Sequence, residues 1–142
     1  LGDPDGLWYV GSRATGPRAV EPGVHGVSNG AFDLSWPKVR HATSGIRELL
    51  SSDDLSPAPL LDLLASRRIA ADEELPDTGV GLQVERFLSA PFIVNESYGT
   101  RASTVILIER DGAVRFVERR FDPKGHPTGE TDESFQLKGR RR

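Results

Sequence analysis

Two β-branched, apolar segments on either side of an Asp-Gly pair constrain the fold of this chain more than any other feature. Residues 104–109 are almost entirely apolar, and residues 114–121 mix apolar with charged side chains. Asp111-Gly112 lies between them and is a favoured pair for a two-residue β-hairpin turn. The pattern predicts an antiparallel hairpin whose first strand is buried on both faces and whose second strand has one wetter face.

Further short strands are predicted elsewhere in the chain. Residues 7–10 are aromatic and β-branched and lie between two glycines, which favours a strand that pairs with residues 18–20. Residues 24–28 predict another strand, which ends at Asn29-Gly30, and residues 92–94 predict a brief one.

The hydrophobic period changes to that of a helix after residue 36. Apolar residues at positions 39, 42, 46 and 49 form one stripe of a helix over residues 37–50, and Pro37 lies in its first turn, where proline is favoured. A second helix is expected after Ser56-Pro57, and a shorter one over residues 82–88. Residues 72–79 are polar and rich in turn formers, and therefore predict a loop.

The order of these elements indicates the fold class. After Asp122 the composition turns to Pro, Gly, Thr and Glu, so residues 123–142 predict a loop and tail with one last strand at residues 134–137. Strands followed by helices and then a hairpin predict an α+β fold with mainly antiparallel sheets. A length of 142 residues fits a single domain.

Composition excludes several classes of function. The chain has 18 basic against 21 acidic residues, a formal charge of −3, which gives no general attraction to nucleic acid. The longest apolar run, residues 105–108, is too short to span a bilayer, and no signal peptide is visible. We therefore expect neither a nucleic-acid partner nor a membrane span, and we expect a cytoplasmic location.

The absence of cysteine and methionine is equally informative. Without cysteine, these residues can form no disulfide, thiolate metal site or cysteine nucleophile. Without methionine, and beginning at Leu1, the sequence contains no translation start, so we expect it to be part of a longer protein. Only three of the 18 basic residues are lysine, a bias that is common in GC-rich bacterial genomes and favours a bacterial source.

Two familiar motifs carry no chemistry in this context. Asp77-Thr78-Gly79 matches the triplet of aspartic proteases, but here it follows Leu75-Pro76 and precedes a helix, which favours a simple turn. The histidines at positions 25, 41 and 126 have no metal-ligand spacing, so no metal site is predicted.

Two clusters are stronger candidates for a site. In the first, Asn29 ends a predicted strand, where its amide can act as a hydrogen-bond donor, and Trp36 follows. In the second, Tyr98 and Arg101 precede the apolar strand, and a guanidinium there is costly unless it is paired or faces a ligand. Structural alternatives remain open, with Asn29 as a left-handed turn residue and Arg101 as half of an ion pair.

Three stretches at these clusters resemble one known family. They are Gly26-Val27-Ser28-Asn29 through Ser35-Trp36-Pro37-Lys38-Val39, then Leu75-Pro76-Asp77-Thr78-Gly79-Val80, then Tyr98-Gly99-Thr100-Arg101 through Ser103-Thr104-Val105. Their order and spacing are similar to those of the NRDE family, also called the transport and Golgi organisation protein 2 family. The resemblance covers residues 6–121, which is most of the chain.

The resemblance implies a fold and a set of site residues. Family members begin Met-Cys and carry an Asn-Arg-Asp-Glu motif soon after, so residues 1–142 would be the C-terminal portion of one domain whose other half is its partner. The family fold is considered similar to N-terminal-nucleophile hydrolases, a four-layer αββα sandwich. By that analogy Asn29 resembles the oxyanion donor and Arg101 the site arginine.

The function implied by the resemblance is the binding and trafficking of haem or a similar amphipathic ligand. Haem would be cargo, no cofactor would be required, and Asn29, Trp36, Tyr98 and Arg101 would contact the ligand in one shared cleft. One alternative is an amidase whose nucleophilic cysteine lies in the missing half, since these residues alone lack a nucleophile. Another alternative is a non-catalytic scaffold. The oligomeric state is not predicted.

Overall fold

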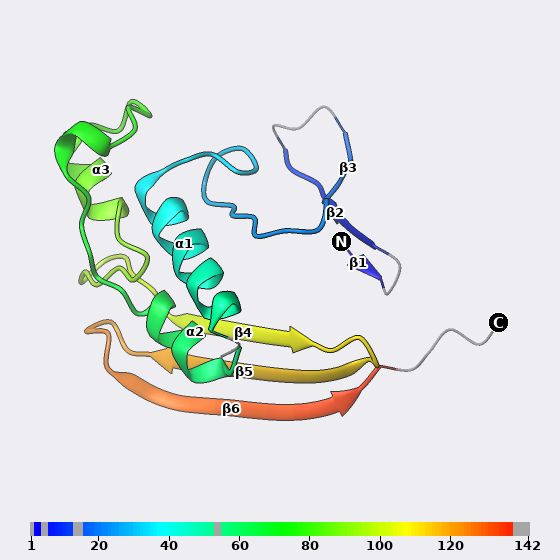
Figure 1. Ribbon diagram of the computed structural model, residues 1–142. Coiled ribbons are helices and arrows are strands. Elements are labelled where there is room, and N and C mark those ends of the chain that lie inside the picture. Colours follow the sequence, from blue (N-terminus) through cyan, green and yellow to red (C-terminus); the bar gives the residue numbers. More distant parts are fainter. Residues whose placement is uncertain (1, 4–5, 13–15, 53–54, 138–142) are drawn as a thin grey trace.

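The computed structural model describes residues 2–3, 6–12, 16–52 and 55–137, which form helices over one antiparallel sheet and a small second sheet (Figure 1). The small sheet has the order β1 (Gly2–Asp3), β2 (Gly6–Tyr9) and β3 (Arg18–Ala19), and the larger one β4 (Ala102–Ile108), β5 (Ala113–Phe121) and β6 (Pro127–Gln136). The helices are α1 (Pro37–Ser51), α2 (Pro57–Leu64) and α3 (Leu82–Leu88), with a 3₁₀ turn at Asp72–Glu74. All strand pairs are antiparallel, so the predicted α+β class is confirmed.

The predicted hairpin is confirmed as β4 and β5, but its turn is one residue longer than expected. The Gly112 N–H donates to the Glu109 carbonyl at 2.9 Å, so the turn is centred on Arg110 and Asp111. Gly112 follows in the left-handed region with φ 87°, a conformation that glycine adopts at little cost. The hairpin therefore closes through a three-residue loop, in which a turn is followed by a left-handed glycine, and not through Asp111-Gly112 alone.

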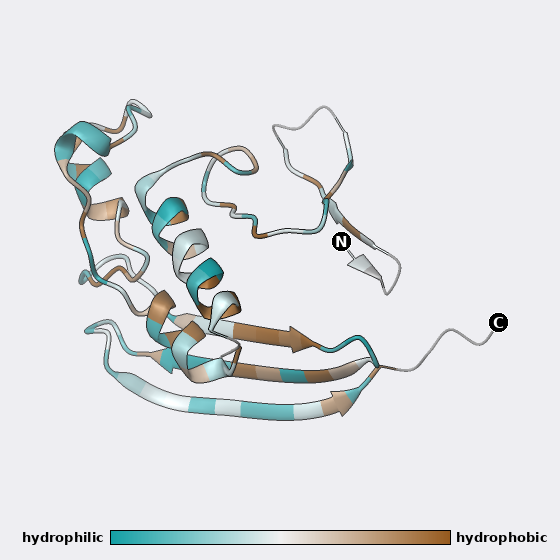
Figure 2. Ribbon diagram, in the orientation of Figure 1, coloured by the Kyte–Doolittle hydropathy of each residue, from teal (hydrophilic) through white to brown (hydrophobic). Residues whose placement is uncertain are grey.

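The sequence-based prediction of a loop after Asp122 is wrong for residues 127–133, because β6 begins at Pro127 and pairs with the whole of β5. The last strand predicted at residues 134–137 is confirmed as the end of β6, and residues 138–142 of the predicted tail lie outside the described residues. Strand β6 is polar along most of its length, as Figure 2 shows, and Phe135 near its end is its one large apolar residue, so it carries no alternating apolar pattern. Its side chains form ion pairs with β5 instead, Arg115 with Asp132 at 2.8 Å and Arg119 with Glu130 at 2.8 Å. Charged residues and a proline at its start are typical of an edge strand that resists further pairing.

Two other predicted strands are absent among the described residues. Residues 24–28 form no ladder, because Asp33 folds back on Gly26: its carboxylate accepts the Gly26 N–H at 2.9 Å, and its own N–H donates to the Gly26 carbonyl at 2.9 Å. Residues 92–94 make only isolated backbone contacts, in which the Phe92 N–H donates to Ser66 and the Thr100 N–H donates to Ile93. Local turn chemistry thus overrides the β-branched composition of both segments.

The core lies between α2 and one face of the larger sheet. Leu61 of α2 packs on Val105 and Val117, and three partly buried leucines surround them: Leu60, Leu64 and Leu107. The register places even-numbered residues of β4 on the opposite face, where Ile106 is 55% and Ile108 64% exposed. The expectation that this strand is buried on both faces is therefore wrong. No helix in the described part of the chain is long and apolar enough to cross a membrane.

Candidate functional site

A cavity of about 500 Å³ lies where the chain enters α1, and we call it the Trp36 cavity. Three segments that are distant in sequence line it: residues 29–38, residues 76–80, and α3 with the residue after it. Its apolar wall includes Leu34, Trp36, Val80 and Leu88, and its polar lining includes Asn29, Lys38, Thr78 and Glu85. A volume of this size, with apolar walls and a few polar groups, is typical of small-molecule sites.

Close packing before α1 shapes one wall of this cavity. Pro37 lies in the first turn of α1, and the N–H of Trp36 donates to the Leu34 carbonyl at 2.8 Å, which turns the chain into the helix. A Cβ on Gly30 would lie 2.5 Å from Leu34 Cδ1 and 3.1 Å from the Trp36 ring. Because a side chain at this position would collide with the wall, Gly30 allows the indole to lie where it does.

A buried carboxylate ties the 76–80 loop to α3. Glu85 is 7% exposed, and its Oε1 accepts the Thr78 N–H at 2.9 Å and the Thr78 hydroxyl at 2.5 Å. The Gly79 N–H donates to the Asp77 carboxylate at 3.1 Å, which confirms that this triplet forms a turn. The turn nevertheless contributes Thr78 to the lining of the Trp36 cavity.

A half-buried lysine faces the same space. Lys38 Nζ donates to the Leu88 carbonyl at 3.0 Å, a contact across 50 residues of sequence. Burial lowers the pKa of Lys38, and the negative charge of Glu85 partly opposes this shift. The ammonium is thus partly removed from water, and a bound anion would be attracted to it.

A second cavity of about 340 Å³ adjoins the first, and we call it the Arg68 cavity. It shares Pro37, Lys38 and Ser89 with the Trp36 cavity. Its remaining lining is more polar, and includes Arg40, His41, Ser44, Arg68 and Glu74. Two of these lining residues, Arg40 and Glu74, form an ion pair at 2.5 Å.

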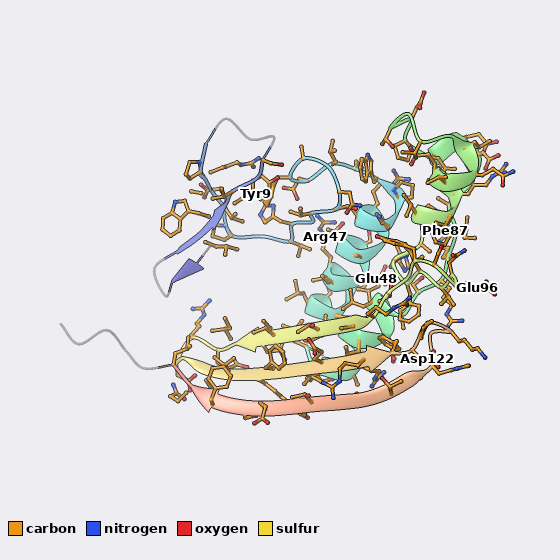
Figure 3. All side chains as sticks on the ribbon, turned by 180° about the vertical axis from the view of Figure 1, so that it is seen from behind. Tyr9, Arg47, Glu48, Phe87, Glu96 and Asp122 are labelled. Carbon is orange, nitrogen blue, oxygen red and sulfur yellow. The ribbon has the colours of Figure 1, made fainter. Side chains whose placement is uncertain are left out.

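The structure brings together two of the four predicted ligand-contact residues. Asn29 and Trp36 line the Trp36 cavity, whereas Tyr98 and Arg101 are not among its lining residues. The Tyr98 ring packs edge-on against Phe87 of α3, with centroids 6.1 Å apart (Phe87 is labelled in Figure 3). Phe87 is not a lining residue either, so this ring contact lies outside the cavity wall.

The structure also tests the structural alternatives for Asn29, as a left-handed turn residue, and for Arg101, as half of an ion pair. Among the described residues Asp33, with φ 58°, is the non-glycine residue in the left-handed region, so Asn29 is not a left-handed turn residue. Arg101 is exposed, and its guanidinium lies 3.4 Å from the Thr100 carbonyl. No salt bridge to Arg101 occurs within the part of the chain that the structure describes.

Comparison with known proteins identifies the family. A family model described as "Transport and Golgi organisation 2" matches residues 2–123. The chain belongs to the transport and Golgi organisation 2 family. Every lining residue of the Trp36 and Arg68 cavities lies inside the matched range, whereas β6 lies outside it.

Individual members of the transport and Golgi organisation 2 family match over about half of their own length. The chain is 31% identical over 133 residues to "Transport and Golgi organization protein 2 homolog" of Homo sapiens, covering 84% of this chain and 47% of that protein. The Bos taurus homolog is 30% identical over 145 residues, 94% of this chain and 52% of its own. The Mus musculus homolog is 27% identical over 141 residues, 90% of this chain and 50% of its own. These relatives are mammalian and lend no support to the bacterial source that the arginine bias favours.

Proposed function

We propose that the protein binds and delivers haem or a similar amphipathic ligand, and that the ligand occupies the Trp36 cavity. The observation that supports this most directly is the pairing of an apolar wall with a half-buried ammonium in one space of about 500 Å³. The Trp36 indole offers a flat face on which a porphyrin can stack, and Lys38 can pair with a carboxylate at its edge. Asn29 can donate or accept a further hydrogen bond at the same wall.

The chemistry of the lining favours contact with the organic part of haem. The described lining of the Trp36 cavity contains no histidine, tyrosine, cysteine or methionine, the side chains that ligate haem iron. The cargo would therefore be held through its ring face and its propionates. A cargo held without an iron–protein bond can leave without breaking one, which suits delivery.

The roles that the family resemblance gives to Tyr98 and Arg101 stay predictions. Neither residue lines the Trp36 cavity, so they would contact only a ligand that extends beyond this cavity. We keep Asn29 and Trp36 as the proposed contact residues of this chain. The amidase alternative places its nucleophilic cysteine outside residues 1–142, and no observation on the described residues favours it.

We also propose that the larger sheet and its helices are one half of a four-layer αββα sandwich. In support, α2 covers one face of β4 and β5, and the opposite face exposes Ile106 and Ile108, as a layer awaiting a second sheet would. The chain spans about half the length of its curated relatives, which leaves them enough residues for such a sheet.

A haem titration with two tryptophan variants tests the proposed function. Haem is added to the purified chain, and binding is followed by the change in its Soret absorption. Trp36→Ala should weaken binding about tenfold, since a buried aromatic contact contributes about 1.4 kcal/mol or more. Trp8→Ala is the matched control, because Trp8 lies on β2, 40% exposed, and does not line the cavity. Equal affinity of both variants would show that haem does not use the Trp36 cavity.

A further inference from the structure

The two cavities adjoin each other but differ in chemistry. The shared residues Pro37, Lys38 and Ser89 place the two cavities side by side, so a molecule that occupies both would contact these residues. On the Trp36 side the walls are mainly apolar, with Leu34, Trp36, Val80 and Leu88. On the Arg68 side the lining includes four charged residues and two serines.

The charges around the Arg68 cavity leave an excess of positive charge. Three of its lining residues are basic, Lys38, Arg40 and Arg68, and one, Glu74, is acidic. Glu74 pairs with Arg40. Arg68 has no salt-bridge partner within the described ranges, and Lys38 makes its recorded hydrogen bond to a backbone carbonyl. Two cationic groups are therefore available to one anion in this space.

The carboxylate of Glu85, whose charge acts on Lys38, is already engaged. Glu85 accepts two hydrogen bonds from Thr78, which hold its carboxylate against the 76–80 loop. An ammonium carries three donors, so Lys38 can keep its bond to Leu88 and still donate to a ligand. A cationic ligand head in the same position would meet Lys38 and Arg68 with like charge.

We propose that the ligand is an amphiphile with an anionic head, whose apolar body fills the Trp36 cavity and whose carboxylate or phosphate enters the Arg68 cavity between Lys38 and Arg68. This inference rests on the proposed function, because it assigns a head-group site to the same ligand. According to this inference, the sign of the charge on the ligand head determines the affinity, because Arg68 and Lys38 bind an anionic head. A carboxylate and a phosphate share the chemistry that the two cations recognise.

A series of dodecyl compounds tests the head-group site. Dodecanoate, dodecyl phosphate, dodecanol and dodecyltrimethylammonium share one tail and differ in their heads, and each is titrated below its micellar concentration. Binding is followed by the fluorescence of Trp36 in a Trp8→Phe background, in which Trp36 is the remaining tryptophan of the chain. At least one of the two anionic compounds should bind about tenfold more tightly than dodecanol, as one charge-assisted hydrogen bond predicts. Dodecyltrimethylammonium, the cationic compound, should bind more weakly than dodecanol. The stronger of the two anions identifies the head as carboxylate or phosphate.

Two arginine variants separate a specific contact from general charge. Arg68→Gln should lose about tenfold in affinity for the anionic compounds and leave dodecanol binding unchanged. Arg67→Gln removes the same charge one residue away, where Arg67 stacks over Phe92 and does not line the Arg68 cavity, so it should keep the preference for anions.

The possible failures point to different conclusions. If dodecanol binds as tightly as both anions, or if Arg68→Gln and Arg67→Gln behave alike, the head-group inference is wrong while the Trp36 cavity remains a ligand site. If haem binding depends on Trp36 but no dodecyl compound binds, the inference is again wrong and the proposed function stands. If neither haem nor any dodecyl compound binds, both are wrong.

Discussion

Replacement of the buried Glu85 tests whether the cavity wall is held together as the hydrogen bonds indicate. In Glu85→Ala, two donors of Thr78 lose a charged acceptor. Such bonds contribute about 1.5–3 kcal/mol each, and Thr78 is exposed enough for water to replace part of the loss. The lower end of the range applies, so we expect the free energy of unfolding to fall by about 3 kcal/mol. For a chain of this length that corresponds to about 10 °C in Tm.

The assay is thermal and urea unfolding followed by circular dichroism, with two comparison variants. Glu48→Ala, at an exposed position of α1, should change stability by less than about 0.5 kcal/mol. Glu85→Gln keeps a carbonyl oxygen for Thr78 and should retain more than half of the stability that Glu85→Ala loses. The reasoning is refuted if Glu85→Ala is no less stable than Glu48→Ala, or if Glu85→Gln is as unstable as Glu85→Ala.

Three further predictions concern the core, a histidine and the open sheet face. Leu61→Ala should lower the free energy of unfolding by about 3 kcal/mol, as the loss of a buried leucine does. Leu50 is 48% exposed, so Leu50→Ala should lower it far less, and similar urea midpoints for the two variants would contradict the core assignment. The Asp33 carboxylate and the Glu21 carbonyl raise the pKa of His25, so its stabilising effect is present below about pH 6.5 and is lost as pH rises through the raised value. The Tm difference between wild type and His25→Gln should therefore become smaller as the pH rises from about 6 to about 8. A difference that stays constant over this range would contradict the stabilising role of the protonated His25. The exposed Ile106 and Ile108 should make the chain self-associate, and replacing both by lysine should lower the mass seen in sedimentation; an unchanged monomer in both proteins would refute this.

Signals that act within a few residues were sufficient to predict most of the fold. The period after Pro37 and the prolines near residue 57 predict α1 and α2, and the apolar run with its Asp-Gly pair predicts the β4–β5 hairpin. The sequence predicts only the end of β6, residues 134–136, because a polar edge strand is specified by backbone pairing and by partners such as Arg115, which lie elsewhere in the sequence. Residues 24–28 were assigned wrongly because the decisive acceptor, the Asp33 side chain, is a hydrogen-bonding competitor that a β-propensity pattern does not record.

The site was predictable only in part, for a related reason. Asn29 and Trp36 were found because they lie in one short motif, and both line the Trp36 cavity. Lys38 and Glu85 were missed as a facing pair, since the lysine contact to Leu88 spans 50 residues and depends on how α3 packs near α1. Arg68 stands in no motif, and only its place in a cavity that adjoins the Trp36 cavity indicates a role for it.

The sequence order of β4, β5 and β6 affects which part of the protein folds first and which part opens most easily. Each of these strands pairs with its neighbour in sequence, so the sheet can close through short loops, and contacts of this kind form early in folding. The Trp36 cavity, in contrast, joins residues 29–38 to residues 76–89 and closes a much longer loop. Opening of the cavity can therefore be a local event that leaves the sheet intact. A bulky ligand can enter through this opening, and backbone amides around the cavity should exchange with solvent before those of β5.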